Sequence, residues 1–172
     1  MLPSHLKRLI AADGWIAEHP ANGGAKTERA SPAQRVLVLS ASQAAQQPAS
    51  RQAAVISIRG AQDREIPLSS KYRGVLRLVF EDLSEVDDGH EADTISEAQA
   101  AAVARFVREH ADARTLIVHC QMGISRSRSM AAAICDVERK PYSYSAVNDA
   151  VYRMVRRALE REREAILNQG QC

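Results

Sequence analysis

The sequence has few cysteines, few aromatic residues and almost no net charge. Its three cysteines, Cys120, Cys135 and Cys172, are widely spaced and odd in number, which excludes a disulfide framework and favours a reducing compartment. A formal net charge of +2 gives no strong field that would attract nucleic acid or a membrane surface. The N-terminal stretch lacks the apolar core of a signal peptide, and no run approaches the roughly 18 apolar residues of a membrane span. We therefore expect a cytoplasmic protein that binds neither nucleic acid nor membrane.

The chain length suits one compact domain preceded by an arm. A weak amphipathic pattern at Ser4–Glu18 is followed by a stretch rich in Pro, Gly and Ala at Pro20–Pro32, which is typical of a linker. We predict an N-terminal arm and linker over residues 1–34 and a folded domain over residues 35–172. A domain of that size buries about two-thirds of its unfolded surface. The sequence of the arm indicates no particular function. No internal repeat is visible in the chain.

Short β-branched runs alternate with helical patterns along the domain. Strands are predicted at Val36–Leu39, Ala54–Ile58, Val75–Phe80 and Leu116–Val118. Helices are predicted within Ala41–Ser50, from a Thr94-x-x-Glu97 capping box to about His110, from Arg126 or Ser127 to Lys140–Pro141, and from about Ser143 to Leu167. This order predicts an α/β domain with a mostly parallel central sheet of four to five strands flanked by helices. Ligands bind beyond the carboxyl ends of strands in such sheets, where Cys120 and Asp82 both lie.

The stretch Thr115–Ser129 (TLIVHCQMGISRSRS) contains the residues on which the prediction of function depends. A short loop between a buried strand and a helix points backbone N–H groups into one concavity, and the helix dipole adds positive potential. Gly123 allows a conformation that a Cβ would resist. Arg126, six positions after Cys120, offers a planar fork for two phosphate oxygens. The same positive environment favours the thiolate of Cys120, so the loop is predicted to bind a phosphate dianion and attack its phosphorus.

The run His119-Cys120-x-x-Gly123-x-x-Arg126-Ser127 resembles the signature of the cysteine-based protein tyrosine phosphatases, HCxxGxxR followed by Ser or Thr. The predicted strand before it and the helix after it match this family too. The short length and the downstream helices look most like the compact bacterial form of the dual-specificity branch. The resemblance covers roughly Ala33–Leu159, and it implies a phosphatase-like catalytic domain over residues 35–172 with a protein tyrosine phosphatase-like fold.

The resemblance implies a role for each matching residue. Cys120 would be the nucleophile that forms a phosphocysteine intermediate, and Arg126 would bind the phosphoryl oxygens and stabilise the transition state. Ser127 would donate its hydroxyl to the thiolate, whereas His119 would be a structural residue whose hydrogen bonds order the loop. The phosphate-binding loop would comprise Cys120, Gln121, Met122, Gly123, Ile124, Ser125 and Arg126. No cofactor is expected, and the His and Cys spacings do not match a zinc site.

Hydrolysis also needs a carboxyl group that first donates a proton to the leaving oxygen and then activates water. Family members take this Asp from a loop after a strand, some thirty-odd residues before the cysteine. Asp82 directly follows a predicted strand but lies 38 positions before Cys120, whereas Asp87 and Asp88 have the more usual interval. We favour Asp82 and keep Asp87 and Asp88 as alternatives. The remaining carboxylates of Glu81–Asp93 are interpreted as an acidic surface loop.

The substrate and two competing activities stay open. The variable loop positions contain no lysine, unlike those of relatives that act on inositol phospholipids, and the chain has only seven aromatic residues with which to build a deep phosphotyrosine pocket. A shallow site for phosphotyrosine, phosphoserine or phosphothreonine is therefore expected. The alternatives are a non-catalytic phosphate-binding module, or another thiol enzyme with a C-x5-R loop such as a sulfurtransferase or arsenate reductase. Cys135 is interpreted as a core residue, with a resolving thiol as the alternative.

Overall fold

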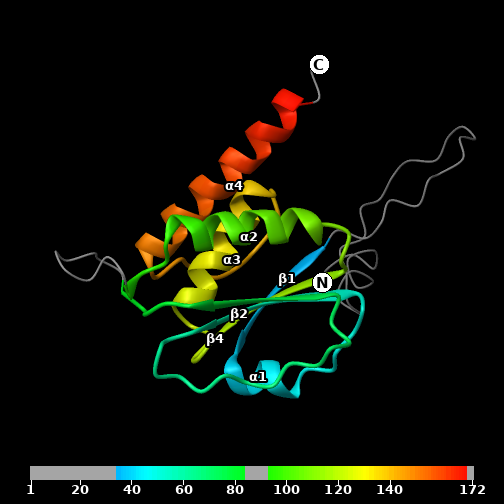
Figure 1. The fold of residues 1–172 in the computed structure, drawn as a ribbon, viewed down its shortest axis with the longest axis vertical. Coiled ribbons are helices and arrows are strands. Elements are labelled where there is room, and N and C mark those ends of the chain that lie inside the picture. The colour runs from blue at the N-terminus through cyan, green and yellow to red at the C-terminus, as the bar shows by residue number, and fades with distance from the viewer. Residues whose placement is uncertain (1–33, 84–92, 170–172) are drawn as a thin grey trace, which may run out of the picture. The chain divides into compact units, whose positions relative to one another are not determined.

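The computed structural model describes residues 34–83 and 93–169, which are built around a parallel β-sheet (Figure 1). Within these residues the sheet has four strands, all parallel, in the order β1-β4-β2-β3. The strands are β1 Arg35–Ser40, β2 Ala53–Arg59, β3 Gly74–Val79 and β4 Thr115–Cys120. The predicted α/β class is confirmed, and the ends of each predicted strand agree with those of an observed strand to within two residues.

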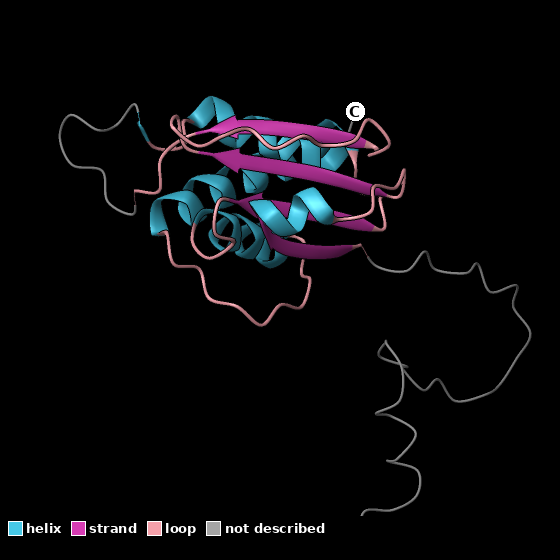
Figure 2. Ribbon diagram, turned by 90° about the horizontal axis from the view of Figure 1, so that it is seen from below, coloured by secondary structure: helices cyan, strands magenta, loops and turns pink. Residues whose placement is uncertain are grey.

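Helices cover both faces of the sheet. The four described helices are α1 Ala41–Gln46, α2 Glu97–Glu109, α3 Arg126–Val137 and α4 Asp149–Gln169. Figure 1 shows α2, α3 and α4 on one face, and Figure 2 shows the short α1 on the other. Because both faces are covered, the strands are continuous apolar runs, and six of the seven residues of β2 are buried.

The side chains of β4 alternate between two hydrophobic clusters. Leu116 and Val118 belong to the larger cluster, which the three long helices complete with residues such as Val103, Ile134 and Val155. Ile117 points the other way into a smaller cluster. Strand β4 is therefore buried between two neighbouring strands and two layers, and Cys120 is its last residue.

Two helix starts differ from the predictions. The capping box of α2 is Ser96 with Gln99 instead of Thr94 with Glu97: the Ser96 hydroxyl accepts from the Gln99 N–H at 3.2 Å, and the Gln99 side chain accepts from the Ser96 N–H at 2.9 Å. Thr94-x-x-Glu97 and Ser96-x-x-Gln99 both match the capping-box pattern, so the sequence alone does not distinguish them.

Helix α4 begins at Asp149, six residues after the predicted start at Ser143. The backbone N–H groups of Val147 and Asn148 donate to the hydroxyl of Ser129, at 3.0 and 2.7 Å, so they are not available to a helix. Val147, in the segment just before the helix, is 56% exposed.

Several sequence predictions fall outside the described residues. The arm predicted over residues 1–34, apart from Gln34, is among them, as are Asp87, Asp88 and Cys172. In the described ranges, no helix is long and apolar enough to span a membrane.

Candidate active site

The loop from Cys120 to Arg126 joins the end of β4 to the start of α3, as predicted. Gly123 has a φ of +72°, in the left-handed region. A Cβ at this position would lie 2.7 Å from the backbone nitrogen of Ser40 and 2.8 Å from the carbonyl carbon of Leu39. Because these are backbone atoms of the end of β1, they cannot move aside easily, and only glycine allows the loop to pass this closely.

The thiol of Cys120 lies at the floor of the loop and is 2% exposed. Its sulfur is 3.1 Å from the hydroxyl oxygen of Ser127 and accepts from the N–H of Gly123 at 3.3 Å. Burial raises the pKa of this thiol, but the Ser127 hydroxyl and the backbone N–H groups of the loop together lower it by more. The pKa of Cys120 therefore lies below its usual value, which favours the nucleophilic thiolate.

Arg126, the first residue of α3, turns its buried guanidinium toward the ends of β2 and β3. Its Nη1 donates to the carbonyl of Phe80 at 2.9 Å, which fixes the plane of the group. Its Nε is buried and has no hydrogen-bond partner among the described residues. A buried N–H without a partner is costly, so this donor is available to an oxyanion that binds in the loop.

Asp82 comes from the loop after β3 and lies beside the phosphate-binding loop. Its Oδ1 accepts from the hydroxyl of Ser125 at 2.6 Å and from the amide of Asn148 at 2.9 Å, and its Oδ2 is 3.9 Å from the Nε of Arg126. Both hydrogen bonds fall on Oδ1, so Oδ2 is the oxygen that remains to carry a proton. The structure thus brings the favoured candidate acid to the loop from 38 positions away in the chain.

Asn148, which sequence reasoning missed, links this carboxylate to the body of the protein. Its side-chain oxygen accepts from the N–H of Val151 and caps α4, while its amide donates to Asp82 and to the carbonyl of Leu83. The Asn-Asp pair at the start of α4 is a readable helix-capping signal. The contact with Asp82, in contrast, depends on the tertiary fold.

Asp63 was also missed. It follows β2, and its Oδ2 lies 3.5 Å from the Nη2 of Arg126. Asp63, Asp82 and Cys120 therefore stand after three neighbouring strands, at the carboxyl edge of the sheet, where ligands bind in parallel α/β folds.

His119 is 2% exposed, and neither ring nitrogen has a hydrogen-bond partner in the described part of the chain. The loop-ordering hydrogen bonds implied by the family resemblance are therefore not seen for this side chain. Burial lowers the pKa of His119 to about 4, and the opposing effect of the Cys120 backbone is smaller. The ring is neutral at pH 7 and packs at the end of β4 as an uncharged group.

Cys135 lies in the last turn of α3 and is 1% exposed. It is nine positions after Arg126, which corresponds to about 13.5 Å of helical rise. Its sulfur is 3.8 Å from the hydroxyl of Tyr144, and burial raises its pKa. These features fit a small core residue and disfavour a resolving thiol.

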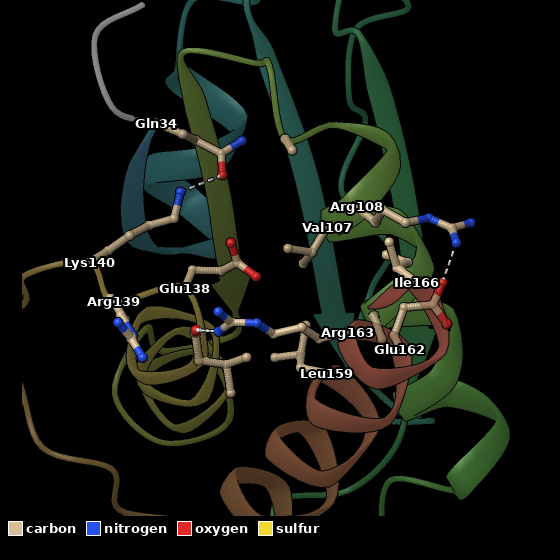
Figure 3. Close-up of a pocket in the computed structure, with 13 residues that line it drawn as sticks. Gln34, Val107, Arg108, Glu138, Arg139, Lys140, Leu159, Glu162, Arg163 and Ile166 are labelled. Carbon is tan, nitrogen blue, oxygen red and sulfur yellow. Dashed lines mark hydrogen bonds and ion pairs between the residues drawn. The ribbon is translucent and has the colours of Figure 1, made fainter. Parts of the chain in front are cut away.

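A second cavity, of about 400 Å³, lies near the start of β1 and the carboxyl end of α3 (Figure 3). Several of the charged side chains that line this cavity form hydrogen bonds with other groups of the protein. Lys140 donates to Gln34 at 3.2 Å, and Arg163 donates to the carbonyl of Val137 at 3.2 Å. None of the candidate catalytic residues lines this cavity.

Searches of family models, curated proteins and solved structures found no match to this chain.

Proposed function

We propose that this protein is a cytoplasmic phosphomonoester hydrolase of the protein-tyrosine or dual-specificity phosphatase type, which forms a phosphocysteine intermediate on Cys120. One observation carries the proposal: a buried thiol with a lowered pKa lies in the same loop as a buried arginine whose Nε has no hydrogen-bond partner. This pairing suits a phosphoryl group, which needs a nucleophile at phosphorus and donors at its equatorial oxygens.

The first step transfers the phosphoryl group to sulfur. The Cys120 thiolate forms a bond to phosphorus while the bond between phosphorus and the ester oxygen breaks. Asp82 donates its proton to that oxygen, so the product leaves as a neutral alcohol or phenol. Arg126 donates to the equatorial oxygens, where charge is concentrated in the transition state.

The second step returns the enzyme to its starting state. Asp82, now a carboxylate, takes a proton from water as the water oxygen bonds to phosphorus and the bond to sulfur breaks. Inorganic phosphate leaves, and the Ser127 hydroxyl, 3.1 Å from the sulfur, stabilises the released thiolate. Both steps use only side chains of the loop together with Ser127 and Asp82.

The entrance to the site favours a neutral or apolar group beside the phosphate. Met122 and Ile124, on the outer side of the loop, are 69% and 47% exposed. The acidic side chains of Asp63 and Asp82 both lie beside Arg126, and they disfavour a second phosphate on the substrate. We favour phosphotyrosine as the substrate, with phosphoserine and phosphothreonine as further candidates.

Hydrolysis of 4-nitrophenyl phosphate by the full chain and by Cys120→Ser tests this proposal. We expect the variant to lose turnover by more than about a thousandfold because the nucleophile is gone, while it still binds vanadate or phosphate through Arg126 and the backbone N–H groups. Turnover that persists in the variant would remove Cys120 as the nucleophile. Loss of oxyanion binding in a variant that is folded would show that the loop is not a phosphate site.

A further inference from the structure

The guanidinium of Arg126 faces a carboxylate that the mechanism above does not use. The Oδ2 of Asp63 lies 3.5 Å from its Nη2, and the two side chains are 28% and 8% exposed. Asp63 comes from the turn after β2, whereas Asp82, on the Nε side of the same guanidinium, comes from the loop after β3. Arg126 is thus approached by two carboxylates from two strands.

The Asp63 carboxylate is held in place by its own turn. Its Oδ2 accepts from the backbone N–H of Gly60 at 2.8 Å, and its backbone N–H donates back to the Gly60 carbonyl at 3.2 Å. The oxygen that faces Arg126 is therefore the one that the turn fixes. A carboxylate fixed in this way is a rigid support for a long arginine side chain.

Glu81 fixes the turn from the other side. Its Oε1 accepts from the N–H of Ala61 at 2.7 Å. A Cβ at Gly60 would lie 2.7 Å from the Oε2 of Glu81 and 3.2 Å from the Oδ2 of Asp63, so a larger residue there would displace the ends of both carboxylate side chains. The neighbours Glu81 and Asp82 therefore act differently: Glu81 orders the turn that carries Asp63, and Asp82 reaches the loop.

The two carboxylates differ in how they contact the loop. Asp82 accepts from the hydroxyl of Ser125, so it reaches the loop directly. Among the described residues, the Asp63 carboxylate is joined to the loop by its ion pair with the guanidinium of Arg126. Asp63 is therefore placed to act on the arginine and not on the leaving group.

We propose that Asp63 is a positioning residue, which together with the Phe80 carbonyl orients the guanidinium of Arg126 so that its free N–H groups face the phosphoryl oxygens. This inference rests on the proposed phosphatase function. Five N–H groups are present on a guanidinium, and one of them is taken by Phe80. Phe80 and Asp63 each engage one hydrogen on a different Nη atom, which leaves the Nε hydrogen and one hydrogen on each Nη for the phosphoryl oxygens.

The test compares Asp63→Asn, Asp82→Asn and a control, Asp112→Asn, with two substrates. Asp112 is an exposed carboxylate that also pairs with an arginine, Arg73, away from the site. Asp63→Asn should lower kcat about ten- to a hundredfold with both 4-nitrophenyl phosphate and phenyl phosphate, because Arg126 serves the phosphoryl group whatever the leaving group. Asp82→Asn should lower kcat much more with phenyl phosphate than with 4-nitrophenyl phosphate, because the leaving oxygen of phenyl phosphate needs a proton. Asp112→Asn should leave kcat unchanged with both substrates.

A double variant separates positioning from a fold defect. If Asp63 acts through Arg126, adding Asp63→Asn to Arg126→Lys should lower kcat almost no further. If Asp63→Asn instead partly unfolds the protein, it should lower kcat by the same factor in the wild-type and the Arg126→Lys backgrounds. Unchanged kcat in Asp63→Asn, or equal losses in the two backgrounds, would overturn the inference. A loss confined to phenyl phosphate would make Asp63 the proton donor instead. A wild type that hydrolyses neither substrate would refute the proposed function itself.

Discussion

At the scale of the residue, two buried thiols show how the environment sets the chemistry of one functional group. Cys120 and Cys135 are 2% and 1% exposed, so burial acts on both. Around Cys120 the hydroxyl of Ser127 and several backbone N–H groups outweigh burial and lower the pKa. Around Cys135 the nearest hydroxyl is at 3.8 Å, and burial raises the pKa. Donor geometry at the end of β4, and not exposure, accounts for the lower pKa of Cys120.

This contrast predicts the pH dependence of alkylation. Because the pKa of Cys120 is lowered, its thiolate is present at pH values below the ordinary titration of a thiol, and iodoacetamide should modify it there. Ser127→Ala should raise the pKa of Cys120 by about one pH unit or more, since a hydrogen bond to a charged group is worth about 1.5–3 kcal/mol. Peptide mapping by mass spectrometry follows each cysteine separately. Cys135 should stay unmodified in the folded protein in both cases; equal reactivity of the two thiols would contradict this account.

At the scale of the element, the ends of α3 and α4 connect stability to the site. Asn148 caps α4 and also holds Asp82, while Ser129 on α3 accepts the N–H groups just before that cap. The carboxyl end of α3 is different. The N–H of Lys140 donates to the carbonyl of Cys135 at 2.8 Å, and Arg139 has a φ of +53°, the left-handed conformation that glycine usually provides at the end of a helix.

Arg139→Gly should therefore stabilise the protein. Glycine removes the cost of the left-handed conformation, and we expect the free energy of unfolding to rise by about 0.5–1 kcal/mol. The matched control is Glu138→Gly, one residue earlier, where φ is −84° and glycine only adds freedom to the unfolded chain. Urea denaturation should show opposite signs for the two variants. A loss of stability in Arg139→Gly would mean that the arginine side chain contributes more than its backbone costs.

At the scale of the whole molecule, the sequence predicted the elements better than their contacts. Apolar β-branched runs identify the strands because both faces of the sheet are buried. The loop between β4 and α3 could be predicted because its glycine, thiol and arginine lie within seven consecutive residues between a strand pattern and a helix pattern. The order of the strands, with β4 between β1 and β2, depends on long-range pairing and was left open.

The contacts that could not be predicted join distant parts of the chain. Asp63 and Asn148 come together with the loop only because the ends of β2 and β3 and the start of α4 meet at one edge of the sheet. The late start of α4 has the same origin, since the hydroxyl of Ser129 takes two N–H groups that a local pattern assigns to the helix. Local pattern therefore predicted a strand, a loop and a helix around Cys120 and Arg126, and the fold added the residues that contact Asp82 and Arg126.

The central claim is that the phosphoryl group passes through the sulfur of Cys120. Asp82→Asn is the suitable protein, because 4-nitrophenyl phosphate needs little acid assistance in the first step, while the second step lacks its base. Rapid acid quenching followed by peptide mapping should find the phosphoryl group on the peptide that contains Cys120, and Asp82→Asn combined with Cys120→Ser should show none. Turnover by the wild type with no phosphoryl group on Cys120 in the Asp82→Asn variant, or with the group on another residue, would contradict the account.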